Sequence, residues 1–245
     1  MKVSIIIFTL NEIDGIKIIM PKLDEVIYLN SILNFGKNKI VENRFELIVV
    51  DGGSTDGTVE WFKDLYIMSN HTITIKIFIQ KEKGMGSAYR EAMERVTGDV
   101  VILFTPDGNS MPEAIPKLLE KIEEGNDIVI ASRYLLPAIS FDDDIVTGFG
   151  NWCFTKLINL LFGGKVTDAL VIYRAYRVDA IRKIGVDTSL PSFGSSILIK
   201  GIKAGLRIAE ISADEPARIG GVRKMRPVYN GLCELRMIFR EWRRK

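Results

Sequence analysis

The sequence predicts an α/β domain of three layers, in which helices cover both faces of a mostly parallel sheet. Five short β-rich runs recur in the first half of the chain, and several of them are apolar at consecutive positions. This composition is typical of strands that are buried on both faces, as in a parallel sheet. Helical patterns lie between the runs, and an alternation of strand and helix favours right-handed crossover connections.

The individual elements are predicted from local patterns. We expect strands at residues 3–9, 46–51, 73–79, 99–105 and 127–132. We expect helices at residues 58–66, 86–96 and 111–125, the last with acidic residues early, a lysine late and a glycine at its end. After residue 133 the alternation is looser: we expect a helix at 151–164, a strand and a helix at 168–181, a helix and a strand at 194–211, a loop at 213–227 and an amphipathic helix at 229–245. We divide the chain into a domain, 1–217, and a C-terminal segment, 218–245.

The composition narrows the class of protein. The 245 residues are 47% hydrophobic and 26% charged, as in a soluble globular protein with one large domain or two small ones. No apolar run approaches the ~20 residues of a membrane span, and the first run ends at Asn11 and Glu12 without a signal-peptide cleavage site. Two cysteines are too few for a disulfide framework, which favours a reducing, cytoplasmic compartment. A zinc site or a Ser-His-Asp triad would need the single histidine, His71, which we expect to be an ordinary loop residue.

Basic charge is concentrated in the C-terminal segment, which holds nine Lys/Arg and two Asp/Glu. Nucleic-acid binding is disfavoured, because the sequence has no platform of stacking aromatic residues and no known reader motif. The apolar residues of the last helix recur at helical spacing among arginines; they are Leu232, Leu235, Ile238, Phe239 and Trp242. Such a helix lies in a lipid headgroup layer as a peripheral membrane contact, or it docks on the domain. For the apolar face of residues 151–162, we favour a role in the core or in a homodimer contact over a membrane contact.

Polar residues follow four of the predicted strands. They are Thr9, Asn11 and Glu12 after the first, Asp51 and Gly53 after the second, Asp107 and Asn109 after the fourth, and Ser132 and Arg133 after the fifth. Ligands of such sheets bind at the carboxyl ends of the strands. Capping explains one polar turn, and we expect Asp56 with Gly57 to cap the following helix. Asp51 ends a buried strand, so we expect it to bind a ligand.

Three further stretches have two interpretations each. "KGMGSA", which contains Gly84, is a phosphate-binding glycine turn at a helix N-terminus or a plain helix start; it is neither a dinucleotide fingerprint nor a P-loop. The aspartates at 142–144 form a solvated loop or a metal site, and we favour the solvated loop. Arg218, Arg223 and Lys224 flank two glycines, in a loop that either folds over a phosphate or is solvated.

Seven stretches occur in the order seen in family 2 glycosyltransferases. They are "SIIIFTLNE", "VVDGGSTDGT", "KGMGSAYREAME", "GDVVILFTPDGNSMPEAIPKLLEKI", "DIVIASRY", "DALVIYRAYR" and "RIGGVRKM". Over roughly residues 3 to 226 the chain resembles the dolichyl-phosphate-mannose synthase branch, which includes bacterial polyprenyl-phosphate sugar transferases. The resemblance implies a GT-A fold, a GDP- or UDP-linked sugar donor, a Mg²⁺ or Mn²⁺ ion, and inverting transfer to an acceptor such as a polyprenyl phosphate.

The resemblance also implies roles for individual residues. Asp51 would hold the base and ribose of the donor, with Thr9 and Glu12 in the same pocket. Asp107 matches the last carboxylate of the family's Asp-x-Asp metal motif, and Asn109 is a second candidate ligand. The other predicted substrate-binding residues are Asn11, Gly53, Gly84, Ser132, Arg133, Arg174 and Arg223. Arg218 and Lys224 would stabilise the leaving diphosphate.

Two positions depart from the family pattern, and one role depends on the acceptor. Thr105 replaces the first Asp of Asp-x-Asp. Ile172 replaces the glycine that precedes an aromatic-Arg pair in the family, and Tyr173 and Arg174 fit that pair. The first replacement motivates an alternative, a non-catalytic protein that binds nucleotide sugars. A phosphate acceptor needs no general base, whereas a hydroxyl acceptor does. For a hydroxyl acceptor Asp168 is the first candidate base, and the aspartates at 142–144 are the second.

Overall fold

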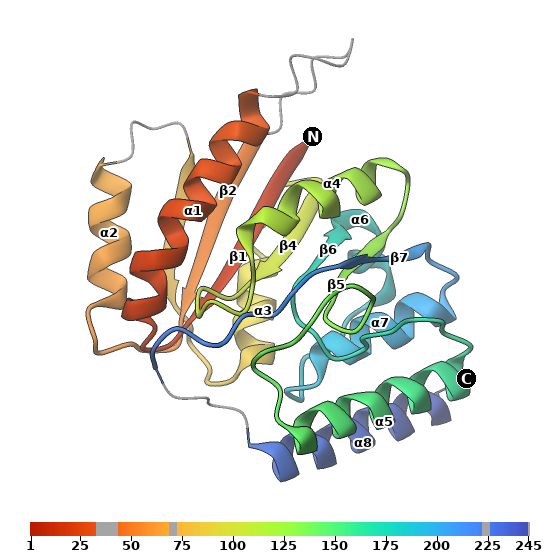
Figure 1. Cartoon of the computed structure of the whole chain (residues 1–245). Coiled ribbons are helices and arrows are strands. Elements are labelled where there is room, and N and C mark those ends of the chain that lie inside the picture. The colour runs from red at the N-terminus through yellow and green to blue at the C-terminus, as the bar shows by residue number, and fades with distance from the viewer. Residues whose placement is uncertain (33–43, 69–72, 222–225, 245) are drawn as a thin grey trace.

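The computed structural model describes residues 1–32, 44–68, 73–221 and 226–244 (Figure 1). The strands are β1 (Lys2–Thr9), β2 (Arg44–Asp51), β3 (Thr74–Ile79), β4 (Val100–Phe104), β5 (Ile128–Ser132), β6 (Arg174–Arg177) and β7 (Ile208–Ser212). The helices are α1 (Ile13–Ile32), α2 (Thr58–Met68), α3 (Met85–Met93), α4 (Ile115–Glu123), α5 (Ile145–Phe162), α6 (Val178–Ile184), α7 (Phe193–Lys203) and α8 (Pro227–Arg243), with a short 3-10 helix, η2 (Pro112–Ala114).

The described strands form one sheet in the order β3-β2-β1-β4-β6-β5-β7. All neighbours are parallel except β6, which runs antiparallel to both β4 and β5. The prediction of a mostly parallel sheet is therefore confirmed. The register pairs Thr9 of β1 with Asp51 of β2, so these two strands end at the same level. The strand order reverses at β1, between β2 and β4, and α/β sheets bind ligands at such points.

Helices cover both faces of the sheet, as predicted. Residues of α1, α2 and α4 pack with one set of strand residues in a first apolar cluster. Residues of α3, α6 and α7 pack in a second cluster on the opposite face, which also includes Ile158 of α5 and Ile238 of α8. The central strands are buried, and in β4 and β5 all five residues are buried, whereas the edge strands β3 and β7 are only partly buried. The sheet is thus rigid where its carboxyl ends support the loops.

The helix α1 was not predicted, although its sequence carries the pattern. Ile16, Met20, Leu23 and Ile27 recur at helical spacing and are buried in the first apolar cluster. Pro21 lies inside the helix and normally disfavours a helix interior. Burial of the apolar face outweighs this local cost.

The helices α5 and α8 lie side by side along one edge of the domain (Figure 1). In α8, Ile238 of the predicted apolar face is fully buried, as is Met237. The other predicted apolar residues are exposed: Leu232, Leu235, Phe239 and Trp242. The helix therefore docks on the domain and still presents an apolar surface. None of the helices in the described ranges is both long and apolar enough to cross a membrane.

Candidate active site

The carboxyl ends of β1, β2, β4 and β5 border a cavity of about 620 Å³. The predicted site residues that line it are Thr9, Glu12, Gly84, Asp107, Asn109, Arg133 and Arg218. These residues come from five separate stretches of the sequence, and the parallel strands bring their ends to one edge. Other predicted site residues do not line this cavity: Asn11, Asp51, Gly53, Ser132, Asp168 and Arg174. Arg223 and Lys224 lie outside the described residues, as does His71.

Asp51 is fully buried beneath the cavity, and both of its carboxylate oxygens accept hydrogen bonds. Oδ1 accepts from the backbone N–H groups of Gly53 at 2.8 Å and Ser54 at 2.7 Å. Oδ2 accepts from the hydroxyls of Thr9 at 2.8 Å and Ser54 at 2.5 Å. Asp51 therefore holds the turn that follows β2.

The turn after β2 is also tied to the start of α1. The Asp56 side chain accepts from the backbone N–H of Thr58 at 3.0 Å, so it caps α2 as predicted, and from that of Ile13 at 3.0 Å. The side chain of Asn11 accepts from the backbone N–H of Thr55 at 2.8 Å. Asn11 has a φ of 52°, in the left-handed region that asparagine tolerates better than most residues. These bonds fix the backbone that carries Glu12.

The carboxylates that follow β1 and β4 share one guanidinium group. Nη1 of Arg218 donates to both oxygens of Glu12 at 3.0 Å, and Nη2 donates to Oδ2 of Asp107 at 2.6 Å. Both acidic residues are buried, with 7% of each exposed. The two carboxylates therefore converge on a single positively charged group inside the cavity.

The same pair of carboxylates fits a divalent cation. Mg²⁺ in nucleotide sites is commonly held by one or two carboxylates plus substrate phosphates and water, and not by a cage made only of protein. Within the described residues no group of three or more His, Cys, Asp or Glu side chains forms such a cage. Asn109 lies beside Asp107, and its amide nitrogen donates to the carbonyl of Pro216 at 3.1 Å. Thr105, in place of the motif's first aspartate, pairs with the hydroxyl of Ser110 at 2.9 Å.

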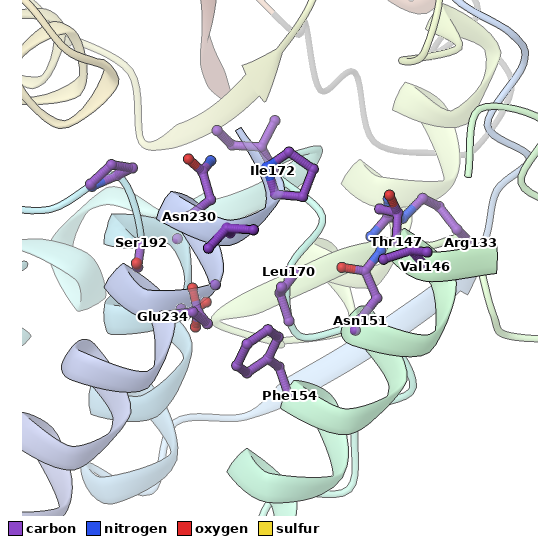
Figure 2. Close-up of a pocket in the computed structure, with 17 residues that line it drawn as sticks. Arg133, Val146, Thr147, Asn151, Phe154, Leu170, Ile172, Ser192, Asn230 and Glu234 are labelled. Carbon is purple, nitrogen blue, oxygen red and sulfur yellow. The ribbon is translucent and has the colours of Figure 1, made fainter. Parts of the chain in front are cut away.

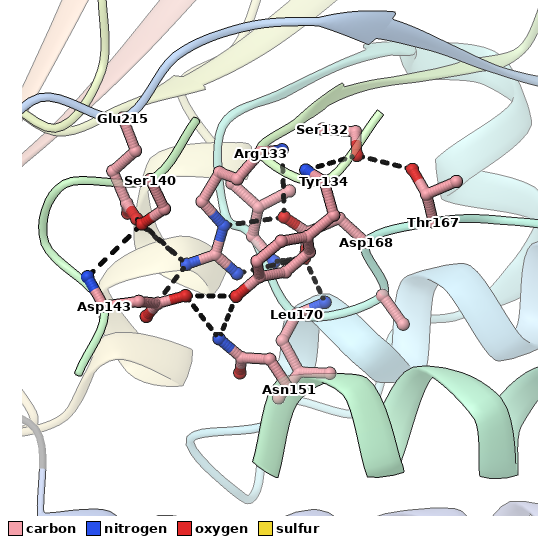
Figure 3. Close-up of polar contacts among 12 residues, drawn as sticks. Ser132, Arg133, Tyr134, Ser140, Asp143, Asn151, Thr167, Asp168, Leu170 and Glu215 are labelled. Carbon is pink, nitrogen blue, oxygen red and sulfur yellow. Dashed lines mark hydrogen bonds and ion pairs between the residues drawn. The ribbon is translucent and has the colours of Figure 1, made fainter. Parts of the chain in front are cut away.

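Arg133 is the centre of a buried polar network on the far side of the cavity (Figure 3). Its Nε and Nη2 donate to the two oxygens of Asp168 at 2.6 and 3.0 Å. Nη1 lies 3.4 Å from Glu215 and 4.0 Å from Asp143. Asp143 in turn accepts from the hydroxyl of Tyr134. The guanidinium is therefore fully engaged with protein groups.

Asp168 is poorly suited to act as a general base. It is fully buried, and burial alone would raise the pKa of its carboxyl. The adjacent charge of Arg133 and the hydrogen bonds to the carboxylate outweigh this effect and lower the pKa below its usual value. Of the second candidates, Asp142 lines the large cavity, whereas Asp144 caps α5 by accepting from the backbone N–H of Thr147 at 2.7 Å.

Two other predicted binding residues are built into the structure behind the cavity. The hydroxyl of Ser132 pairs with that of Thr167 at 2.6 Å and accepts from two backbone N–H groups of the next loop. Arg174 is fully buried and donates to the carbonyls of Gly194 at 3.0 Å and Ala169 at 2.6 Å. Both residues position the loops that follow β5 and precede β6.

A second cavity, of about 450 Å³, was not predicted (Figure 2). It lies between α5, the start of α7 and α8, and its polar lining includes Asn151, Ser192, Asn230 and Glu234. Burial raises the pKa of Glu234 to about 7, although hydrogen bonds from Ser195 and Ser192 oppose the shift. An acidic residue within a basic helix was the only sequence signal for this site.

The two cavities adjoin. Residues that line both are Arg133, Leu170, Ile172, Pro191 and Asn230. The first cavity has carboxylates at the strand ends. The second has apolar side chains of α5 and α8 in its wall, including Val146, Phe154 and Val228, beside the polar side chains named above. The site as a whole can therefore hold a charged ligand at one end and an apolar one at the other.

Comparison with known proteins identifies the class that this fold and site define. The sequence profile described as "Glycosyl transferase family 2" matches residues 4–185, well over half of the chain. The chain belongs to glycosyl transferase family 2.

Its relatives and structural neighbours agree with this assignment. The chain is 28% identical to the undecaprenyl-phosphate mannosyltransferase of Micrococcus luteus, over 92% of this chain and 88% of that protein. It is 36% identical to the dolichol-phosphate mannosyltransferase of Pyrococcus furiosus, but over 55% of this chain and only 34% of that longer protein. The glucosyl-3-phosphoglycerate synthase of Mycobacterium tuberculosis, solved with Mn²⁺, UDP and phosphoglyceric acid, superposes with a TM-score of 0.65 at 20% identity, over 98% of this chain and 78% of that one. The predicted GT-A fold is confirmed.

Proposed function

We propose that this enzyme transfers a sugar from a nucleoside-diphosphate sugar to a polyprenyl phosphate, with inversion at the anomeric carbon. The observation that carries the proposal is the adjoining pair of cavities, one with carboxylates at the strand ends, the other with apolar side chains of α5 and α8 in its wall. A donor with a charged diphosphate suits the first, and an acceptor with a hydrocarbon chain suits the second. The names of the relatives from Micrococcus luteus and Pyrococcus furiosus support the same pair of substrates.

The donor half of the site supplies charges of both signs. Thr9, Gly52 and Gln80 line the cavity near the turn that Asp51 holds, which suits the nucleoside. Glu12 and Asp107 would hold Mg²⁺ or Mn²⁺, with Asn109 as the neighbouring neutral candidate. When bound, the ion would neutralise the negative charge that develops on the leaving diphosphate. Arg218 would donate two further hydrogen bonds to the same oxygens, because a guanidinium fits phosphate in a bidentate way.

The acceptor half needs no general base when the nucleophile is a phosphate. An oxygen of the ionised phosphate forms a bond to the anomeric carbon from the face opposite the leaving group, and the bond to the nucleoside diphosphate breaks. Burial of Asp168 and its ion pair with Arg133 are in keeping with this chemistry. For a hydroxyl acceptor, Asp142 is the one carboxylate of the 142–144 group that lines the cavity.

The surface of α5 and α8 is suited to a peripheral membrane contact, which would leave the acceptor's chain in lipid. Large apolar side chains that are exposed on the two helices include Ile145, Val146, Phe149, Trp152, Leu160, Val228, Leu232, Phe239 and Trp242. Phe149 and Trp152 stack on each other at 6.0 Å between ring centroids. Exposed basic residues on the same helices, Lys156, Arg236 and Arg243, would favour anionic lipid headgroups. A homodimer through this surface is the competing interpretation.

The test is a transfer assay with separate GDP- and UDP-linked sugars and polyprenyl phosphate in anionic vesicles with Mn²⁺. We expect a lipid-linked sugar monophosphate in one donor series, with the opposite anomeric configuration by NMR. Asp107→Asn serves as the matched loss-of-function control. Nucleotide-sugar binding without any lipid product would favour the non-catalytic alternative. A product on a soluble hydroxyl acceptor alone would refute the polyprenyl-phosphate assignment.

A further inference from the structure

Arg218 occupies the point at which two of the acidic residues that line the donor cavity meet. Its guanidinium spans Glu12 and Asp107, which precede it in the sequence by 206 and 111 residues. The side chain of Arg218 is 19% exposed, and those of Glu12 and Asp107 are 7% and 10% exposed. Two carboxylates that are held this close in a buried setting repel each other unless a cation lies between them. Arg218 is that cation here.

The backbone around Arg218 holds the guanidinium in place. The N–H of Ile219 donates to the carbonyl of Asp107 at 2.7 Å. Gly220 and Gly221 have φ values of 64° and 63°, which other residues rarely adopt. A Cβ on Gly220 would lie 2.7 Å from the side chain of Asp14, and one on Gly221 would lie 3.2 Å from Oε2 of Glu12. Glycine at both positions therefore allows this segment to lie directly on the acidic residues.

One donor of Arg218 is left over in this arrangement. Its Nε is buried and has no hydrogen-bond partner among the residues that the structure describes. A buried donor without a partner carries a free-energy cost that a new acceptor would remove. Oxygens of a diphosphate are such acceptors, and they bind guanidinium through two parallel hydrogen bonds. Arg218 therefore has a better set of partners available once a diphosphate enters the cavity.

We propose that Arg218 is the resident counter-ion of the Glu12–Asp107 pair and that it changes places with the divalent cation. In the free protein the guanidinium neutralises both carboxylates and competes with the metal. When a nucleoside diphosphate enters, Arg218 turns to its phosphate oxygens and releases the carboxylates to the ion. Metal and nucleotide then bind cooperatively, each increasing the affinity for the other by the same factor. The role of the diphosphate in this exchange rests on the proposed function.

The exchange is tested by Mn²⁺ titration followed by electron paramagnetic resonance, which detects free Mn²⁺ without any turnover. We expect the wild-type protein to bind Mn²⁺ at least ~10-fold more tightly when GDP or UDP is present, within the usual range of coupling between sites. Arg218→Ala should bind Mn²⁺ alone at least ~10-fold more tightly than the wild type. In this variant the factor by which the nucleotide raises the Mn²⁺ affinity should fall toward one. Arg226→Ala, which removes an exposed arginine eight residues further along the chain, is the matched control.

Thermal melting keeps the test valid if Arg218→Ala folds poorly. Mn²⁺ alone should raise the melting temperature of this variant and leave that of the wild type almost unchanged, because a ligand stabilises the state that binds it. Arg218→Lys keeps a positive charge but cannot span both carboxylates in the same way, and should give an intermediate Mn²⁺ affinity.

Two results would overturn the exchange: equal Mn²⁺ affinity of Arg218→Ala and wild type without nucleotide, or no detectable Mn²⁺ binding by the Arg218 variants. If the exchange is observed but no nucleotide sugar is turned over, the proposed function fails and the exchange stands. If the wild type transfers sugar and Mn²⁺ binding does not respond to Arg218, only the exchange fails.

Discussion

Replacement of Asp168 separates a structural role from a catalytic one. The carboxylate is fully buried and accepts two hydrogen bonds from the guanidinium of Arg133, at 2.6 and 3.0 Å. It also accepts from the backbone N–H groups of Leu170 at 3.2 Å and Val171 at 3.1 Å. Asp168→Ala leaves the buried guanidinium without its main partner. We therefore expect the free energy of unfolding to fall by about 3–5 kcal/mol, the range measured when one member of a buried ion pair is removed.

For a chain of this size that loss corresponds to a decrease in melting temperature of roughly 6–20 °C. Urea denaturation followed by circular dichroism, at pH 7 and at lower pH, measures both the loss and its origin. The folded-state pKa of Asp168 is lowered, so its stabilisation is present above its ordinary pKa of 3.8 and is lost as the pH falls through the folded-state value. The difference between wild type and Asp168→Ala should therefore shrink in strong acid.

Asp168→Asn is the matched control, because it keeps the shape and removes the charge. If Asp168 positions Arg133, this variant should lose stability but retain transfer to a phosphate acceptor once folded. If Asp168 is a general base, transfer should fall by ~10²–10⁴-fold in fully folded protein. A loss of less than 1 kcal/mol in Asp168→Ala, or a folded Asp168→Asn protein without activity, would refute our reasoning.

Four further predictions concern the two cavities and the surface. Asp107→Ala should abolish the Mn²⁺-dependent part of nucleotide binding in calorimetry while the fold remains intact, and wild-type transfer rates in this variant would contradict the assignment. Asp51→Asn should weaken GDP or UDP binding by ~1.5–3 kcal/mol; an unchanged affinity with a lower melting temperature would mean that Asp51 only holds its turn. The pKa of Glu234 is raised from 4.5 to about 7, so the folded state holds its proton more tightly than the unfolded state. The free energy of unfolding should therefore fall by about 3 kcal/mol as the pH rises from 4.5 to 7, and Glu234→Gln should remove this part of the pH dependence. Vesicles of anionic lipid should pellet the wild type at low salt and pellet Trp152→Ala less; a wild type that stays in the supernatant would exclude the membrane contact.

The cavity at the strand ends was largely predictable because parallel topology follows from local patterns. Buried runs alternate with helices, so the strand ends must meet at one edge. Thr9, Glu12, Asp107 and Asn109 line one cavity there, as that logic requires. Gly84 lines it as well, at the start of α3. The helix α1 was missed because Pro21 conceals a helical pattern whose apolar face is buried only in the folded protein.

Contacts between side chains that are far apart in the sequence could not be predicted from local sequence patterns. Nothing in the stretch around Arg218 indicates that its guanidinium meets Glu12, 206 residues earlier. Arg133 and Asp168 each resemble a ligand-binding residue in isolation, yet they bind each other. Arg174 follows an aromatic residue as the family pattern implies, but it is buried behind the cavity.

The local order of strands, helices and polar turns is encoded in the period and composition of the sequence, since hydrophobic burial and capping act over a few residues. Which charges neutralise one another depends instead on distances in the folded chain. Electrostatic attraction in a buried site is strong only between groups that tertiary packing brings within hydrogen-bonding distance. For this reason the strand-end cavity could be foreseen, whereas the pairing of Arg218 with Glu12 and Asp107 emerged only from the tertiary structure.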